Sequence, residues 1–154
     1  MAKVYLGLGT NLGDKEDNLH NAVNEIEKRI GNVLSLSAFY DTEPWGFNSD
    51  NTFLNAVLIA ETNLLPLDVL TQTQNIEKDL GRIAKSVNRS YADRIIDIDI
   101  LLYNDLILNT KQLTIPHPLM TERLFVMEPL VEVAPDLLHP VLGKTMKELL
   151  LKLV

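Results

Sequence analysis

The ten residues from Arg94 to Tyr103, RIIDIDILLY, show the period-two alternation of a β-strand. One face of this strand is apolar throughout and consists of Ile96, Ile98, Ile100 and Leu102. The other face holds two carboxylates among apolar neighbours and consists of Ile95, Asp97, Asp99, Leu101 and Tyr103. Two residues of strand rise are roughly 6.5–7 Å, so both carboxylates can reach one cation or a close pair of cations. Solvated aspartates on a wet face are the alternative, but the apolar neighbours argue against an open surface.

A basic segment precedes the aspartate strand. It contains five basic residues against two acidic ones, which are Lys78, Arg82, Lys85, Arg89 and Arg94 against Asp79 and Asp93. The segment has a net charge of +3 within a chain whose net charge is −7. This pattern predicts a polyanion bridged by Mg²⁺, with arginines on phosphate oxygens and aspartates on the metal. A solvated charged loop is the alternative.

Composition limits the class of protein. A chain of 154 residues with 46% hydrophobic and 23% charged residues predicts a single globular domain over 1–154. The absence of cysteine excludes disulfides, thiolate metal sites and cysteine catalysis. A pI near 4.9 argues against nucleic-acid binding, and no apolar run is long enough for a membrane span. Since there is no signal-peptide pattern either, we expect a cytoplasmic monomer that binds a small anionic ligand.

The order of strand and helix patterns predicts an α+β fold. We expect strands over Lys3–Gly9, Val33–Tyr40, Phe53–Glu61 and Arg94–Tyr103, a hairpin of Leu106–Leu108 with Leu113–Ile115, and helices from Asp14 to Ile30, Pro66 to Leu80, Thr121 to Val133 and Lys144 to Leu151. Gly81 is the expected stop of the second helix. Strand–helix–strand–strand–helix–strand is the ferredoxin-like split βαβ pattern, which predicts an antiparallel sheet with helices packed on one face.

Small and aromatic residues mark a possible ligand face. Gly7 and Gly9 share one strand face and permit close approach of a ligand or another backbone. Phe53 and Asn55 also share a face, and an aromatic ring beside an amide suits a flat heterocycle. A buried asparagine satisfied by neighbouring backbone is equally compatible with this pattern. The loop Asp41–Thr52 is either a lid over a ligand or a satellite packing cluster.

The histidines do not form a metal motif. Their spacing is unlike that of zinc ligands, and we expect His20 and His139 at the surface. His117 lies between two prolines and is therefore held on a stiff stretch.

The chain closely resembles the 6-hydroxymethyl-7,8-dihydropterin pyrophosphokinases of folate biosynthesis. The resemblance covers nearly the whole chain through GLGTNLGD, FYDTEPWGF, FLNAV, LGR, DRIIDIDILLY, LTIPHP and ERLF. It implies transfer of the β,γ-pyrophosphoryl group of ATP to the hydroxymethyl oxygen of the pterin, with release of AMP. Nothing in the sequence requires a general base, so none is assigned.

The resemblance also implies roles for individual residues. Asp97 and Asp99 match the ligands of two Mg²⁺ ions, and Arg82 and Arg94 match the arginines that clamp the phosphates during transfer. The pterin-binding positions are Thr42, Trp45, Phe53, Asn55 and Phe125. The nucleotide-binding positions are Gln74, Glu77, Arg82, Arg94, Ile100, His117 and Arg123. The loops Asp41–Thr52 and Arg82–Asp93 resemble the family's mobile lids.

Three departures from the family pattern fall mostly on the second lid and the nucleotide contacts. Ala84 replaces a common arginine, Tyr91-Ala92-Asp93 replaces Trp-Gly-Pro, and Pro118 replaces a frequent tyrosine. Two rival functions are compatible with parts of the pattern. A nucleotide-sensing module would bind ATP without consuming it, and a metal-dependent phosphohydrolase would release phosphate without a pterin.

Overall fold

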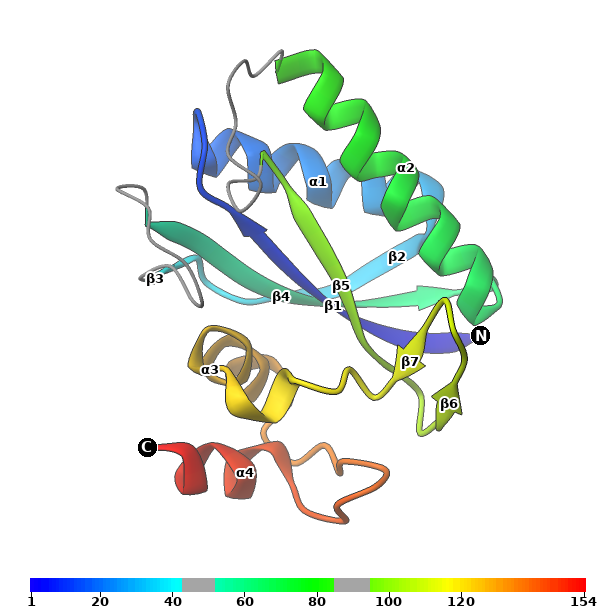
Figure 1. Ribbon diagram of the computed structural model, residues 1–154, viewed down its shortest axis with the longest axis vertical. Coiled ribbons are helices and arrows are strands. Elements are labelled where there is room, and N and C mark those ends of the chain that lie inside the picture. The colour runs from blue at the N-terminus through cyan, green and yellow to red at the C-terminus, as the bar shows by residue number, and fades with distance from the viewer. Residues whose placement is uncertain (43–51, 85–94) are drawn as a thin grey trace.

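Figure 1 shows the computed structural model of the protein, which describes residues 1–42, 52–84 and 95–154, with side chains described for 1–42, 52–81 and 95–154. The elements are β1 (Ala2–Thr10), α1 (Lys15–Arg29), β2 (Gly31–Leu36), β3 (Tyr40–Thr42), β4 (Phe53–Thr62), α2 (Pro66–Ala84), β5 (Asp97–Tyr103), β6 (Leu108–Asn109), β7 (Thr114–Ile115), a 3₁₀ turn (Met120–Glu122), α3 (Leu124–Val133) and α4 (Met146–Leu153). Within these residues no helix combines the length and the apolar character needed to cross a bilayer.

The main sheet is antiparallel, with strand order β2-β4-β1-β5, and β3 pairs with β4. Together with the crossover helices α1 and α2, this order confirms the predicted ferredoxin-like fold. The expected hairpin is also present as the short pair β6 and β7.

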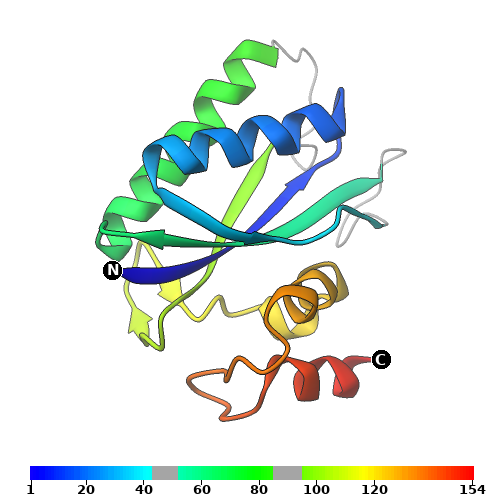
Figure 2. The same ribbon diagram turned by 180° about the vertical axis from the view of Figure 1, so that it is seen from behind.

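Helices cover both faces of the sheet, which corrects the expectation that they pack on one face. Helices α1 and α2 lie on one side, and α3 and α4 lie on the other (Figures 1 and 2). The first core cluster, which includes Leu6, Ile26 and Ile76, joins the sheet to α1 and α2. The second, which includes Val57 and Met127, joins the sheet to α3 and α4. Because strand residues alternate between faces, both clusters draw on the same strands.

A β-bulge changes the face of the last residues of β5. Leu6 pairs with Ile100 and Tyr5 with Leu102, so Leu101 is an extra residue in the register. Leu102 therefore joins Leu101 in the second core cluster, while Tyr103 packs against the first. The predicted alternation is right up to Ile100 and wrong for Leu102 and Tyr103.

Other element boundaries also differ from the expectation. The predicted strand Val33–Tyr40 is two strands, because residues 37–39 belong to neither β2 nor β3. Helix α2 continues through Gly81 to Ala84, so Gly81 is not its stop. Thr121 lies in the 3₁₀ turn, and Arg123 is the N-cap residue of α3.

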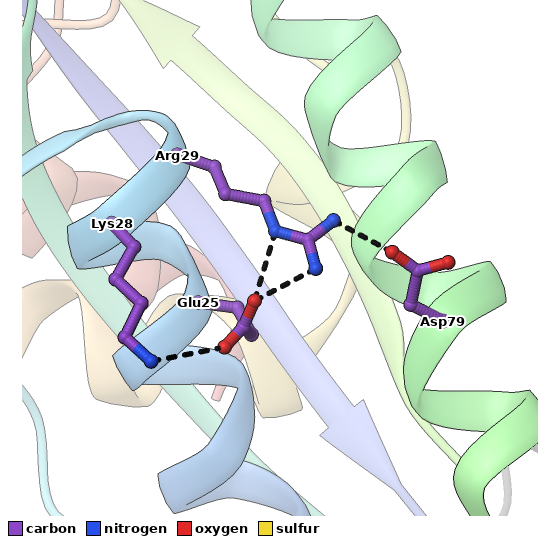
Figure 3. Close-up of polar contacts among 4 residues, drawn as sticks. All are labelled: Glu25, Lys28, Arg29 and Asp79. Atoms are coloured by element: carbon purple, nitrogen blue, oxygen red, sulfur yellow. Dashed lines mark hydrogen bonds and ion pairs between the residues drawn. The ribbon is translucent and has the colours of Figure 1, made fainter.

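Ion pairs join α1 to α2, the helix that also carries Glu77. Arg29 lies 2.8 Å from both Glu25 and Asp79, and Lys28 lies 3.6 Å from Glu25 (Figure 3). Asp79 is two residues beyond Glu77, so the bond from Arg29 joins α1 to the part of α2 that contacts β5.

Gly31 allows β2 to begin directly against β4, and replacing it should strongly destabilise the protein. A Cβ atom at position 31 would fall on the carbonyl oxygen of Glu61 and lie 3.0 Å from the Cα of Thr62. Both neighbours are backbone, so relief requires a shift of the strand. We expect Gly31→Ala to lower the free energy of unfolding by about 3 kcal/mol in urea titrations.

Gly143→Ala is the matched control. Gly143 has φ +67°, but a methyl group added there would have no atom of the described residues within 4 Å, so only the backbone conformation is unfavourable. That cost is about 1–2 kcal/mol. Equal losses for the two variants would contradict a steric requirement for glycine at position 31.

Candidate active site

A row of four residues crosses the sheet on the side that faces α3. Tyr40 pairs with Asn55, Asn55 with Gly9, and Gly9 with Asp97. Residues opposite one another in a sheet point to the same face, so Asn55 and Asp97 flank a position without a side chain. They are two strand spacings apart, about 9–10 Å. A flat ring placed over Gly9 can therefore reach an amide at one end and a carboxylate at the other.

The amide of Asn55, on one side of Gly9, is held in place. Asn55 is 5% exposed, and its Nδ2 donates to the Thr42 hydroxyl over 2.6 Å. Its Oδ1 faces Gly9, since a Cβ there would lie 2.8 Å from that atom. The same Cβ would lie 3.6 Å from the ring of Phe53. The structure thus brings Thr42, Phe53 and Asn55 together around one position, with a hydrogen-bond acceptor directed at it.

Carboxylates gather at the other end of the row. Asp97 and Asp99 lie on the same face of β5, opposite Gly9 and Gly7. Glu77 approaches from α2, and its carboxylate accepts a hydrogen bond from the backbone N–H of Ile98 over 2.8 Å. Among the described strands β5 lies at the edge of the sheet, so this bond gives a partner to a backbone N–H on that edge.

The electrostatics of this cluster favour a cation. Burial, with repulsion from Asp97, raises the pKa of Asp99, and burial likewise raises the pKa of Glu77 despite the hydrogen bond from Ile98. Within the described ranges, no three carboxylate or imidazole side chains already converge enough to hold a metal ion alone. Mg²⁺ does not require this, because it usually takes one or two carboxylates and completes its shell with water and substrate phosphates. The all-oxygen donor set of Asp97 and Asp99 therefore fits Mg²⁺.

The segment after β7 brings two further residues, His117 and Arg123, beside β5. The backbone N–H of His117 donates to Leu101 over 2.9 Å, and the His117 Nδ1 accepts from Leu119 over 3.2 Å. Burial and nearby Arg123 lower the pKa of His117, so its imidazole is neutral at pH 7 and carries its proton on Nε2. Arg123 lies 5.5 Å from the centre of the Phe125 ring and offsets part of the shift of the Asp99 pKa.

The remaining predicted site residues are Gln74, Ile100, Trp45, Arg82 and Arg94. Gln74 is exposed on α2, one turn before Glu77. The side chain of Ile100 is buried in the first core cluster, away from the aspartates. Trp45, Arg94 and the side chain of Arg82 lie outside the described residues, as do Tyr91-Ala92-Asp93 and the side chain of Ala84.

His139 is buried, contrary to the expectation that it lies at the surface. It is 7% exposed, and its Nδ1 accepts hydrogen bonds from the backbone N–H groups of Val141 and Leu142. Burial lowers its pKa. His139 therefore organises the turn before α4. His20 is exposed, as expected.

Comparison with known proteins identifies the family. The model of the 7,8-dihydro-6-hydroxymethylpterin-pyrophosphokinase family (HPPK) matches residues 5–135. The chain belongs to this family. The resemblance stated from the motifs is therefore confirmed.

Two bacterial relatives match the HPPK chain over nearly its full length. The 2-amino-4-hydroxy-6-hydroxymethyldihydropteridine pyrophosphokinase of Porphyromonas gingivalis is 50% identical over 141 residues, which cover 91% of this chain and 95% of the relative. The Aquifex aeolicus protein of the same name is 40% identical over 148 residues, which cover 96% of this chain and 90% of the relative.

A solved structure gives the same fold. The Plasmodium falciparum HPPK-DHPS crystal structure matches with a TM-score of 0.76 at 20% identity. The match covers 99% of this chain and 43% of that chain. At this identity the likeness supports the fold alone.

Two features of this candidate site are not predicted from the sequence. The position of Gly9 between Asn55 and Asp97 depends on strand order, although the shared face of Gly7 and Gly9 hinted at close approach. The bond from Ile98 to Glu77 joins residues 21 apart in the chain. Its only signal was that Glu77 lies near the start of the basic segment.

Proposed function

We propose that the face around Gly9 and Asp97 carries out the reaction of the HPPK family. In this reaction the pyrophosphoryl group of ATP is transferred to the hydroxymethyl oxygen of 6-hydroxymethyl-7,8-dihydropterin, a step of folate biosynthesis. The products are AMP and the pterin diphosphate. We assign residues 1–154 to a single pyrophosphokinase domain.

The pterin is assigned to the position over Gly9. Phe53 and Phe125 stack on its rings, Asn55 binds its polar edge, and Thr42 and Trp45 complete the pocket. The observation that carries this assignment is the row of Asn55, Gly9 and Asp97, which spans about 9–10 Å. A bicyclic pterin in this row has its hydroxymethyl group at the carboxylate end.

The triphosphate is assigned to the carboxylate end and the basic segment. Asp97 and Asp99 would hold two Mg²⁺ ions, whose positive charge would offset that of the triphosphate. Arg82 and Arg94 clamp the phosphates and take up negative charge during in-line transfer. Gln74, Glu77, His117 and Arg123 surround the nucleotide, and the backbone of Ile100 is available to it. With donor and acceptor oxygens aligned, the residues act mainly through positioning and electrostatics.

Phosphorus NMR tests the activity directly. We expect the protein with ATP and Mg²⁺ to form AMP only after hydroxymethyldihydropterin is added. Phosphate release regardless of the pterin would favour a phosphohydrolase. ATP binding without any turnover would favour a sensor module.

Phe125→Ala should weaken pterin binding more than ATP binding, since the ring also lies against Arg123. An aromatic stacking pair contributes about 0.5–1.5 kcal/mol beyond burial, so we expect the Kd for the pterin to rise about threefold to tenfold. Fluorescence titration with the pterin measures this change. Phe125→Tyr is the control, since it retains the ring and should bind nearly as the unaltered protein does. An unchanged Kd for Phe125→Ala would assign Phe125 to the core alone.

A further inference from the structure

Glu132 connects α3 to the segment that leads into β3. Strand β3 holds the Asn55 amide through Thr42. Its carboxylate accepts the backbone N–H of Ala38 at 3.0 and 3.2 Å and the Tyr40 hydroxyl at 2.6 Å. These partners lie 92 and 94 residues away in the sequence. The bond to Glu132, followed by burial, raises the pKa of Tyr40 to about 12, so the hydroxyl keeps its proton as a donor.

The chain needs this connection because it leaves the sheet between β2 and β3. Ser37 still pairs with Val57 through its backbone N–H, at 2.9 Å, and through its hydroxyl, at 3.0 Å. The next residue, Ala38, donates its N–H to Glu132 instead of to β4. Glu132 thus fixes the point at which the chain turns into β3.

Strand β3 carries this constraint to the site. Tyr40 lies opposite Asn55, and Thr42 lies opposite Phe53. The Thr42 hydroxyl accepts the Asn55 amide over 2.6 Å, which directs Oδ1 of Asn55 toward Gly9. A shift of β3 would therefore change which side-chain atom of Asn55 is directed toward Gly9.

Helix α3 also carries Phe125. Phe125 and Glu132 are seven residues apart, which is about two helical turns, so they lie on one side of α3 and about 10 Å apart. Helix α3 packs on β4 and contacts β3. One rigid element thus bears an aromatic ring of the pocket and the carboxylate that holds the opposite wall.

We propose that Glu132, through Ala38 and Tyr40, is a positioning residue for the pterin pocket: it holds β3 so that the amide of Asn55 keeps its acceptor toward the substrate. This inference rests on the proposed function, because it takes the face around Gly9 as the pterin site. Glu132 itself does not contact the substrate.

The test compares Glu132→Ala with Glu132→Gln and with the matched control Glu128→Ala. Glu128 lies one turn earlier on α3 and is exposed, as Glu132 is; among the described contacts it acts on Tyr40 through its charge alone. For Glu132→Ala we expect the KM for the pterin to rise about tenfold with the KM for ATP unchanged. Glu132→Gln keeps an acceptor oxygen and should recover most of this loss. Glu128→Ala should stay within twofold of the unaltered protein.

A second measurement needs no substrate. Hydrogen exchange of the Asn55 side-chain amide, followed by NMR, should be at least tenfold faster in Glu132→Ala and unchanged in Glu128→Ala. An unchanged exchange rate for the Asn55 amide in Glu132→Ala would overturn the positioning role of Glu132. So would equal rises in the KM for the pterin and the KM for ATP. Failure of the unaltered protein to form AMP would instead contradict the proposed function, so the two failures are distinguishable.

Discussion

Asp97→Asn should reduce the rate of AMP formation by about 10²–10³-fold, the loss typical when one preorganised charge-stabilising group is removed. Asparagine has nearly the same shape as aspartate but lacks the charge that a divalent cation requires. The pterin Kd should be nearly unchanged, because Asn55 lies on the other side of Gly9 from Asp97, and Phe53 is two residues from Asn55 on the same strand. Phosphorus NMR gives the rate, and fluorescence titration gives the pterin Kd.

A measurement of stability shows whether Asp97→Asn loses activity without losing its fold. Removing the charge of Asp97 relieves repulsion within the cluster of Glu77, Asp97 and Asp99. In the absence of metal, Asp97→Asn should therefore unfold at a urea concentration equal to or above that of the unaltered protein. Asp105→Asn is the control, since Asp105 is exposed in the turn after β5. Near-normal turnover of Asp97→Asn would exclude Asp97 as a metal ligand.

Removal of the metal ion should reduce AMP formation, as Asp97→Asn does. Treatment with EDTA should abolish AMP formation, and added Mg²⁺ should restore it in the unaltered protein but not in Asp97→Asn. Activity that survives complete chelation would contradict the assignment of Mg²⁺ to Asp97 and Asp99.

Local periodicity was sufficient to predict most of the fold. The alternation in β5 placed Asp97 and Asp99 on one face and Ile98 on the other, and the register with β1 agrees with this. The prediction failed beyond Ile100 because a bulge at Leu101 adds a residue that periodicity cannot detect. Gly81 was expected to end α2, but a glycine inside a helix costs only about 1 kcal/mol, and the helix continues.

Contacts that form only in the folded chain, one of them local and the others long-range, explain what the sequence could not provide. His139 is buried because its imidazole accepts two backbone N–H groups of its own turn, which its spacing from other histidines does not indicate. Glu132 is, in the sequence, one charge among several near the end of a helix, and its partners lie more than 90 residues away. Strand periodicity and charge indicate Asp97, Asp99 and the basic segment, and motif resemblance adds the individual roles, whereas the grouping around Gly9 depends on the strand order.

Gly9→Ala should raise the Kd for the pterin by at least about tenfold. The added methyl group would lie 2.8 Å from Oδ1 of Asn55, which is closer than side-chain carbons approach in folded proteins. Asn55 is buried and tied to Thr42, so it can relieve the clash only by giving up its present orientation. Each neutral hydrogen bond that a displaced amide loses costs about 0.5–1.5 kcal/mol, and two such bonds account for the tenfold effect.

Gly7→Ala is the matched control, because Gly7 lies two residues earlier on the same face of the same strand. Its added methyl group would meet the Leu101 side chain at 3.5–3.7 Å, an ordinary van der Waals contact. The two variants add the same atom to the same strand, so differences in strand propensity cancel. We expect the pterin Kd of Gly7→Ala to stay within about twofold of the unaltered value. Equal affinities for the two variants would mean that the pterin does not bind over Gly9, and the assignment of the row from Asn55 to Asp97 would then be wrong.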